Sequence, residues 1–129
     1  MLDNSGPRFL EIIEDLLKSS EESLIDNTLY VLSCIASGNS KHKKIVLEDR
    51  YLLRAFELLK TTESSSIKIA AINLMLNLVY KESDQLGDSK ARKHVIDLGL
   101  IEVLESMRKK ENDPNVKGNI DRLLRKVVE

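Results

Sequence analysis

The stretch IKIAAINLMLNLVYK, residues 67–81, decides the fold of this chain. Its apolar side chains recur every three to four residues, and more of them fill the positions between, so nearly every face of a helix would be apolar. A helix of this kind is buried on all sides and needs other helices around it. No stretch of the chain shows the sustained alternation of apolar and polar residues that marks a strand. We therefore expect an all-α protein in which residues 67–81 form a central helix.

Weaker helical patterns lie on both sides of this central segment. Gly38 and Gly99 are natural helix ends, and Pro114 suits a first helical turn. The polar run 61–66 is expected to be a turn, and residues 82–89 are expected to form the longest loop. The predicted helices, apart from the central one, cover residues 7–17, 21–37, 41–47, 51–60, 90–97, 100–110 and 115–128.

The chain repeats its own pattern. Residues 15–23, DLLKSSEES, align with residues 57–65, ELLKTTESS, at an offset of 42 with five of nine positions identical. Residues 40–52 align with residues 89–101 at an offset of 49, and residues 63–76, which include most of the central helix, align at the same offset with residues 112–125. The extra residues fall in the predicted loop. A pattern that returns after ~40–47 residues is typical of helical repeat proteins.

Each repeat predicts a short helix, a second helix, a polar turn and a third, more apolar helix. One such unit cannot bury its apolar face alone, whereas stacked units share a continuous core and form a long surface. We therefore expect one domain over residues 1–129, an α-solenoid (α-α superhelix) of about three repeats. The units cover approximately residues 7–38, 40–81 and 89–129.

Composition agrees with one globular domain and excludes several classes of protein. The 129 residues are 42% hydrophobic and 32% charged, which is neither a disordered nor a membrane composition. The net charge of −1 draws the chain neither to nucleic acid nor to a membrane. Cys34 is the only cysteine, and the start of the chain has no signal-peptide pattern. We expect a protein of the cytoplasm, the nucleus or both.

Catalytic chemistry finds little support in the sequence. His42 and His94 lie on equivalent predicted helices but not at aligned positions, and no spacing of ligands indicates a metal site. No phosphate-binding or nucleophile motif occurs. Cys34 falls on an apolar-rich helix, so we expect it to be a buried packing residue. We predict a protein that is not an enzyme and has no cofactor and no metal.

Two basic clusters fall at equivalent places in consecutive units. If the units stack, the clusters share one edge and could bind an acidic partner, a phosphorylated partner or a nucleic-acid backbone. The alternative is that these are ordinary solvated helices, and nucleic acid is disfavoured because no aromatic residues interleave with the basic ones. The candidate strip consists of Lys41, Lys43 and Lys44, followed by Lys90, Arg92 and Lys93.

With these residues in view, the chain resembles the armadillo-repeat family. Residues 92–104, RKHVIDLGLIEVL, are similar to the junction between the first and second helices of an armadillo unit, with Gly99 at the turn. Residues 70–79, AAINLMLNLV, are similar to the third helix, with Asn77 at the position of the groove asparagine. The resemblance implies an armadillo-type solenoid that binds other proteins.

A narrower resemblance is to the C-terminal repeats of the armadillo scaffold subunits of CTLH (yeast GID) ubiquitin ligases. It spans about residues 9–129 and rests on residues 32–53 and 67–104, which include an acidic-polar insertion, a basic short helix and an L-G-L-I junction. Because those subunits are several times longer, the chain would correspond only to their C-terminal part. The resemblance implies a scaffold without chemistry of its own, whose partners are ligase subunits or a substrate receptor.

The resemblance also implies that the third helices line a concave groove. Asn77 could hold the backbone of a partner there, or it could brace neighbouring turns of this chain. The preceding unit departs from the family pattern, with Arg50 aligned to Gly99 and Cys34 aligned to Asn77. An exposed N-terminal end of the stack could also pair with another chain or with further repeats. The candidate groove residues are Asn73, Asn77 and Tyr80, with Tyr30, Arg122 and Lys126 at equivalent positions.

Overall fold

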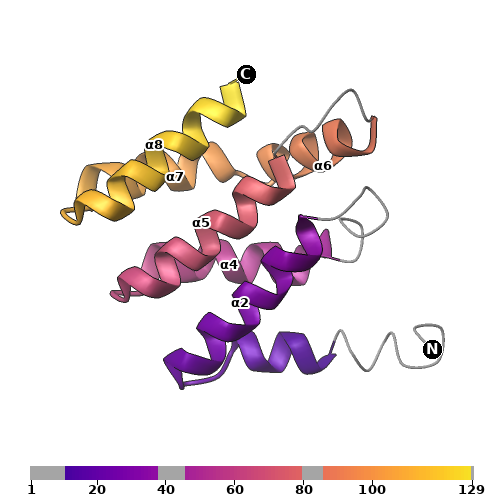
Figure 1. Cartoon of the computed structure of the whole chain (residues 1–129), viewed down its shortest axis with the longest axis vertical. Coiled ribbons are helices and arrows are strands. Elements are labelled where there is room, and N and C mark those ends of the chain that lie inside the picture. The colour runs from indigo at the N-terminus through magenta and orange to yellow at the C-terminus, as the bar shows by residue number, and fades with distance from the viewer. Residues whose placement is uncertain (1–10, 38–45, 80–85, 129) are drawn as a thin grey trace.

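The computed structural model describes residues 11–37, 46–79 and 86–128, with side chains described for residues 92–127 of the last range (Figure 1). Every secondary-structure element in these ranges is a helix, which confirms the predicted all-α class. Residues 11–17 are helical. The other helices are α2 (Glu22–Ala36), α4 (Asp49–Thr61), α5 (Ser65–Val79), α6 (Leu86–Asp97), α7 (Leu100–Lys110) and α8 (Pro114–Val128).

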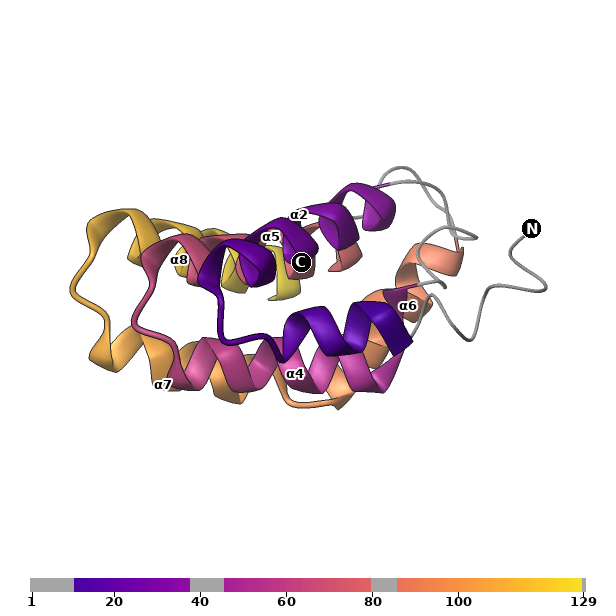
Figure 2. The same ribbon diagram turned by 90° about the horizontal axis from the view of Figure 1, so that it is seen from below.

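The helices lie in two layers. Helices α2, α5 and α8 form one layer, and residues 11–17, α4 and α7 form the other (Figure 2). Helix α5 contacts α2 and α8 within its own layer and α4 in the other layer. Helix α6 contacts α5 and α7 near one end of the layers. This arrangement covers most of α5 with other helices and leaves the face that carries Asn73 exposed.

Helix α5 is the centre of the core, as the sequence predicts. It buries residues on more than one side, whereas α2 and α8 each bury a single stripe. Burying one Leu or Ile side chain contributes roughly 1.5–3 kcal/mol, so α5 supplies a large part of the apolar burial. The buried residues of α5 are Ile67, Ala71, Ile72, Leu74, Met75, Leu76, Leu78 and Val79.

Gly99 joins α6 to α7 through a backbone conformation that favours glycine. Its φ angle is 109°, in the left-handed region. Its N–H donates to the carbonyl oxygen of Ile96 at 3.0 Å, and its own carbonyl accepts the N–H of Val103 at 3.2 Å. One residue therefore ends one helix and begins the next, at the turn that the sequence predicts.

The predicted loop over residues 82–89 is partly wrong, because α6 begins at Leu86. The sequence of this stretch contains Gly87, Asp88 and Ser89, which normally favour turns. Each costs at most about 1 kcal/mol in a helix, and packing against α5 and α7 offsets that cost. Gly38 and most of the predicted helix 41–47 lie outside the described residues.

Two apolar side chains lie on unexpected sides of their helices. Cys34, predicted to be buried, is exposed. Leu53 is 52% exposed, although its neighbours Leu52 and Phe56 are buried. Helical spacing shows which residues share a face, but it does not show which face another helix covers.

Polar side chains tie α5 to the turn that precedes α8. The Lys68 Nζ donates to the Glu111 Oε1 at 2.8 Å, and the Ser65 Oγ donates to the Asp113 Oδ2 at 3.0 Å. The hydrogen bond from Lys68 lowers the pKa of the Glu111 carboxyl, against the raising effect of its burial. Asp113 also accepts the N–H of Asn115 at 2.9 Å and so caps α8, which begins at Pro114.

Candidate protein-binding groove

A groove of about 690 Å³ crosses the layer formed by α2, α5 and α8. All three helices contribute side chains to it, and α5 lies between α2 and α8 (Figure 1). Ile69, Ala70 and Leu76 of α5 give it an apolar lining. A concave surface with an apolar lining and a few polar side chains is the usual form of a binding site.

The groove brings together five of the six groove residues predicted from the sequence. They converge because they occupy equivalent positions on consecutive helices of one layer. The sixth, Tyr80, lies outside the described residues. The five residues that line the groove are Tyr30 from α2, Asn73 and Asn77 from α5, and Arg122 and Lys126 from α8.

Asn77 braces the layer from within the groove. Its Nδ2 donates to the carbonyl oxygen of Ser33 at 2.9 Å and contacts the Ser33 Oγ at 2.7 Å. These hydrogen bonds connect α5 to α2 across 44 residues of sequence. Asn73, one turn earlier on α5, is exposed and lines the same groove. The structure therefore favours bracing for Asn77 and leaves Asn73 facing solvent.

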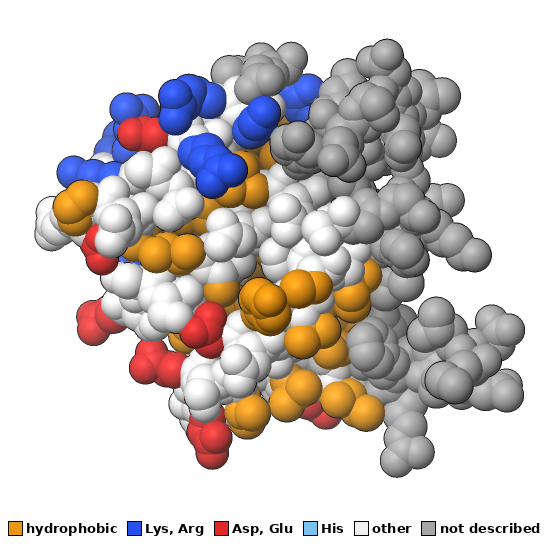
Figure 3. All heavy atoms as spheres, in the orientation of Figure 1, with side chains coloured by type: hydrophobic (Ala, Val, Ile, Leu, Met, Phe, Trp, Pro, Cys, Tyr) orange, Lys and Arg blue, Asp and Glu red, His pale blue; other side chains and the backbone are white. Residues whose placement is uncertain are grey.

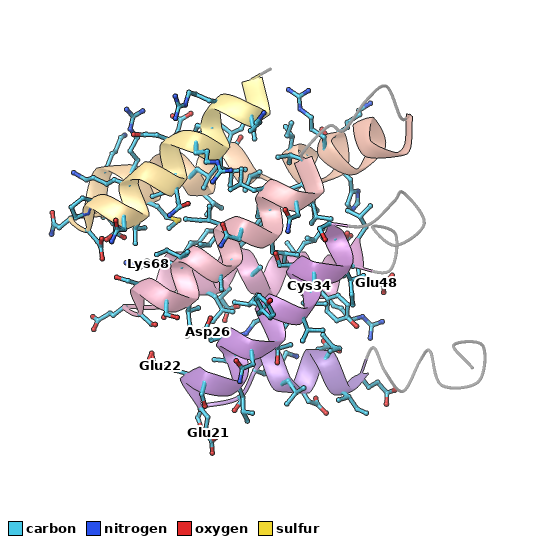
Figure 4. All side chains as sticks on the ribbon, in the orientation of Figure 1. Glu21, Glu22, Asp26, Cys34, Glu48 and Lys68 are labelled. Atoms are coloured by element: carbon cyan, nitrogen blue, oxygen red, sulfur yellow. The ribbon has the colours of Figure 1, made fainter. Side chains whose placement is uncertain are left out.

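The groove has charges of opposite sign at its two ends. Asp26 lies at the α2 end, where its carboxylate accepts a hydrogen bond from the Ser66 hydroxyl (Figure 4). Arg122 and Lys126 lie at the α8 end; Arg122 is exposed and Lys126 is half-buried. Figure 3 shows basic side chains gathered over α8 and acidic ones toward the start of α2. A ligand with the opposite polarity would fit this distribution of charge.

Tyr30 adds an exposed aromatic ring to the wall of the groove. It is 69% exposed and belongs to α2. A tyrosine offers a large apolar surface together with a hydroxyl, and such residues often anchor protein partners. Its position on α2, one helical turn after Asp26, suits contact with an apolar side chain of a ligand.

The structure describes two side chains of the candidate basic strip, those of Arg92 and Lys93. Lys41, Lys43, Lys44 and the side chain of Lys90 lie outside the described residues, and Lys93 is exposed on α6. Arg92 is half-buried, and one of its terminal nitrogens donates to the carbonyl oxygen of Val127. Arg92 therefore helps to close the last turn of α8 rather than presenting a free cation. The sequence does not reveal this role, because Val127 is 35 residues away.

Sequence reasoning missed Asp26, Ser33 and Ser66 as groove residues. Asp26 and Ser33 flank Tyr30 at steps of four and three, so the stripe that includes Tyr30 already contains them. Ser66 lies at the start of α5, where a serine is commonly interpreted as a residue that begins the helix rather than as one that lines a groove. Extending the predicted stripe around Tyr30 by one helical turn in each direction would have identified Asp26 and Ser33.

Two further observations bear on function. None of the described helices has the length and apolar character needed to cross a membrane. Within the described residues, no three His, Cys, Asp or Glu side chains are grouped as a metal site would require.

No protein-family model matches the sequence, and a search of curated proteins finds no match. The fold and the groove define this chain as an all-helical protein in which three helices line one groove.

Proposed function

We propose that this chain is a non-catalytic protein-interaction scaffold whose groove on α2, α5 and α8 holds a segment of a partner protein. The observation that carries the proposal is the groove itself, where five residues from equivalent positions of three helices meet. Three successive helices contribute to the groove, so it extends across the whole layer. Such a shape suits an extended chain better than a compact small molecule.

The architecture we propose is an armadillo-type α-solenoid of about three repeats. Three helix pairs follow one another in the same order: residues 11–17 with α2, α4 with α5, and α7 with α8. Helix α5 contacts α2 and α8, and α4 contacts α7. Arg54 of α4 also donates to the carbonyl oxygen of Leu17 at 2.9 Å. Repetition of one packing arrangement along an axis is the defining property of a solenoid.

The charges and lining of the groove define the chemistry of the partner segment. Its acidic side chains would lie toward Arg122 and Lys126, and a polar or basic residue would lie toward Asp26. Between them, an aliphatic side chain would contact Ile69, Ala70 and the ring of Tyr30, while the amide of Asn73 would bond the backbone. We propose an extended segment that is acidic at one end.

The partners we propose are subunits or a substrate receptor of a CTLH/GID-type ubiquitin ligase, in the cytoplasm, the nucleus or both. The support is the resemblance of residues 32–53 and 67–104 to the C-terminal repeats of armadillo repeat-containing protein 8. In that assembly, the role of the chain is to hold a receptor near the ligase core for proteasome-dependent degradation. An armadillo-type adaptor of another pathway would use the same groove.

Affinity purification from cells of the source organism, followed by mass spectrometry, tests both parts of the proposal. The intact protein should retain RING-type and LisH/CTLH-type ligase subunits. Arg122→Glu should lose them, because it places a negative charge where the acidic segment binds. Arg125→Glu is the matched control, since Arg125 is an exposed arginine on α8 that does not line the groove.

The possible outcomes test the groove as a binding site and the ligase assignment separately. Retention of ligase subunits by both variants would show that the groove is not their binding site. Recovery of other proteins, lost only in Arg122→Glu, would keep the groove and remove the ligase assignment. Recovery of nucleic acid, with a steep dependence on salt, would contradict a protein-binding scaffold.

A further inference from the structure

Helix α2 carries a second apolar stripe that faces away from α5. Leu24, Asn27 and Val31 follow one another at steps of three and four, so they share one face of the helix. Leu24 is 38% exposed and Val31 is 46% exposed. Figure 3 shows hydrophobic side chains reaching the lower edge of the molecule, where α2 and residues 11–17 lie. We call the surface formed by Leu24, Asn27 and Val31 the α2 edge. Ile12, in the helical residues 11–17 of the other layer, is also exposed.

The same positions are buried in the other two helices of this layer. Leu24 and Val31 are the third and tenth residues of α2, and the third and tenth residues of α5 and α8 are also apolar. In α5 and α8, the rest of the protein covers the residues at these positions. In α2, no further helix of the described structure covers Leu24 and Val31. The buried equivalents are Ile67 and Leu74 in α5 and Val116 and Leu123 in α8.

The opposite end of the layer is polar. Lys117 and Arg125 of α8 are exposed, and the Asp121 carboxylate pairs with the Arg108 guanidinium at 3.2 Å. A polar end of this kind is what a soluble repeat protein needs at the edge of its stack. It does not suit the apolar α2 edge, so head-to-tail stacking of two copies would leave charged groups against Leu24 and Val31.

We propose that the α2 edge pairs with the α2 edge of a second copy of this chain, around a two-fold axis at Asn27. The stripe is self-complementary, because Asn27 lies between Leu24 and Val31. In an antiparallel pair, Leu24 of each copy meets Val31 of the other, and the two Asn27 carboxamides face each other. A two-fold contact of this kind uses the same patch on both copies and closes on itself.

The charges on α2 select the antiparallel direction. Glu21, Glu22 and Asp26 lie at the start of the helix, and residues 27–36 carry no charge (Figure 4). A parallel pair would bring the acidic starts of the two helices together. An antiparallel pair places them at opposite corners, so it avoids this repulsion and also aligns the helix dipoles favourably.

Sedimentation of the purified protein tests the association. Between about 1 and about 100 μM, the range in which small interfaces dissociate, the mass should rise from one chain toward two. The double variant Leu24→Glu, Val31→Glu should stay monomeric at every concentration, with unchanged helical content. Leu53→Glu should dimerise normally, because Leu53 is exposed on α4 and lies outside the α2 edge.

Disulfide trapping tests the register. In a Cys34→Ser background, Asn27→Cys should form a cross-linked dimer on mild oxidation, since the axis brings the two residues within disulfide distance. Ser23→Cys in the same background should not cross-link, because the two copies of residue 23 would be separated by roughly nine helical rises of 1.5 Å. A protein that is monomeric throughout this range overturns the proposal. A dimer that survives the double variant, or that cross-links through residue 23 but not residue 27, overturns the α2 contact or its register.

Discussion

Asn73 and Asn77 lie one helical turn apart on α5, and their surroundings give them different roles. Both line the groove. Asn77 is half-buried and donates to the Ser33 backbone carbonyl and contacts its hydroxyl, whereas Asn73 is exposed. An asparagine that connects two helices contributes to stability, and an exposed one at the same surface is available to a ligand.

We expect Asn77→Ala to lower the free energy of unfolding by about 1–3 kcal/mol, because it removes hydrogen bonds to the buried Ser33. The carbonyl of Ser33 keeps its helical bond from the Ser37 N–H at 3.1 Å, so the fold should survive. Asn73→Ala should leave stability unchanged and weaken partner binding. Urea unfolding of the two variants checks the contrast. Equal loss of stability in both would show that Asn73 also has a structural role.

Periodicity and the repeat alignment place Tyr30, Asn73, Asn77, Arg122 and Lys126 on one surface, and the structure brings these residues together. The sequence does not distinguish the asparagine that braces from the one that is exposed. That distinction depends on Ser33, which is 44 residues from Asn77 and has no recognisable motif. Contacts of this range depend on how the units stack, so they are determined only in three dimensions.

Among the helices, α5 shows how well the pattern of apolar residues predicts which parts of a helix are buried. Its run of apolar residues predicts burial on all sides. Its contacts with α2, α4, α6 and α8 bury most of the helix, but the face that carries Asn73 is open to the groove. Helix α2 has a less continuous pattern of apolar residues. The sequence predicts that its Cys34 is buried, but Cys34 is exposed. The two helices differ in their number of neighbours, which the sequence of each helix alone does not contain.

Two leucine substitutions test the contrast between buried and exposed positions. Leu74→Ala should lower the free energy of unfolding by about 2–5 kcal/mol, since Leu74 is almost fully buried and its loss leaves a cavity. Leu53→Ala removes the same atoms from a half-exposed site on α4 and should cost far less. Thermal or urea unfolding measures both. A small effect of Leu74→Ala would contradict the central position of α5.

At the scale of the whole molecule, ionised side chains help to hold the last helix pair against the one before it. Lys68 of α5 and Glu111, at the end of α7, form an ion pair that is mostly buried, and Asp113 joins Ser65 to the start of α8. Breaking such a pair leaves a buried charge without its partner. The pair therefore couples the stacking of the units to pH.

We expect stability to fall in mild acid because of this coupling. The hydrogen bond from Lys68 lowers the pKa of Glu111 below its ordinary value of 4.5, so the folded state binds fewer protons than the unfolded state in that range. The stabilisation is therefore complete above pH 4.5 and is lost as the pH falls through the lower pKa of the folded state. Asp113, whose pKa is lowered by the Asn115 N–H and by Ser65, acts in the same direction below its ordinary value of 3.8.

Urea unfolding at pH 7 and at a series of values below 5 checks this expectation. Glu111→Gln should be less stable at pH 7, because Lys68 loses its charged partner, and its stability should fall less steeply in acid. Glu105→Gln is the matched control, since Glu105 is an exposed carboxylate on α7, the helix that Glu111 follows. If Glu111→Gln kept the full acid dependence, other carboxylates would be responsible for it. The ion pair would then hold the geometry of the turn without coupling it to pH.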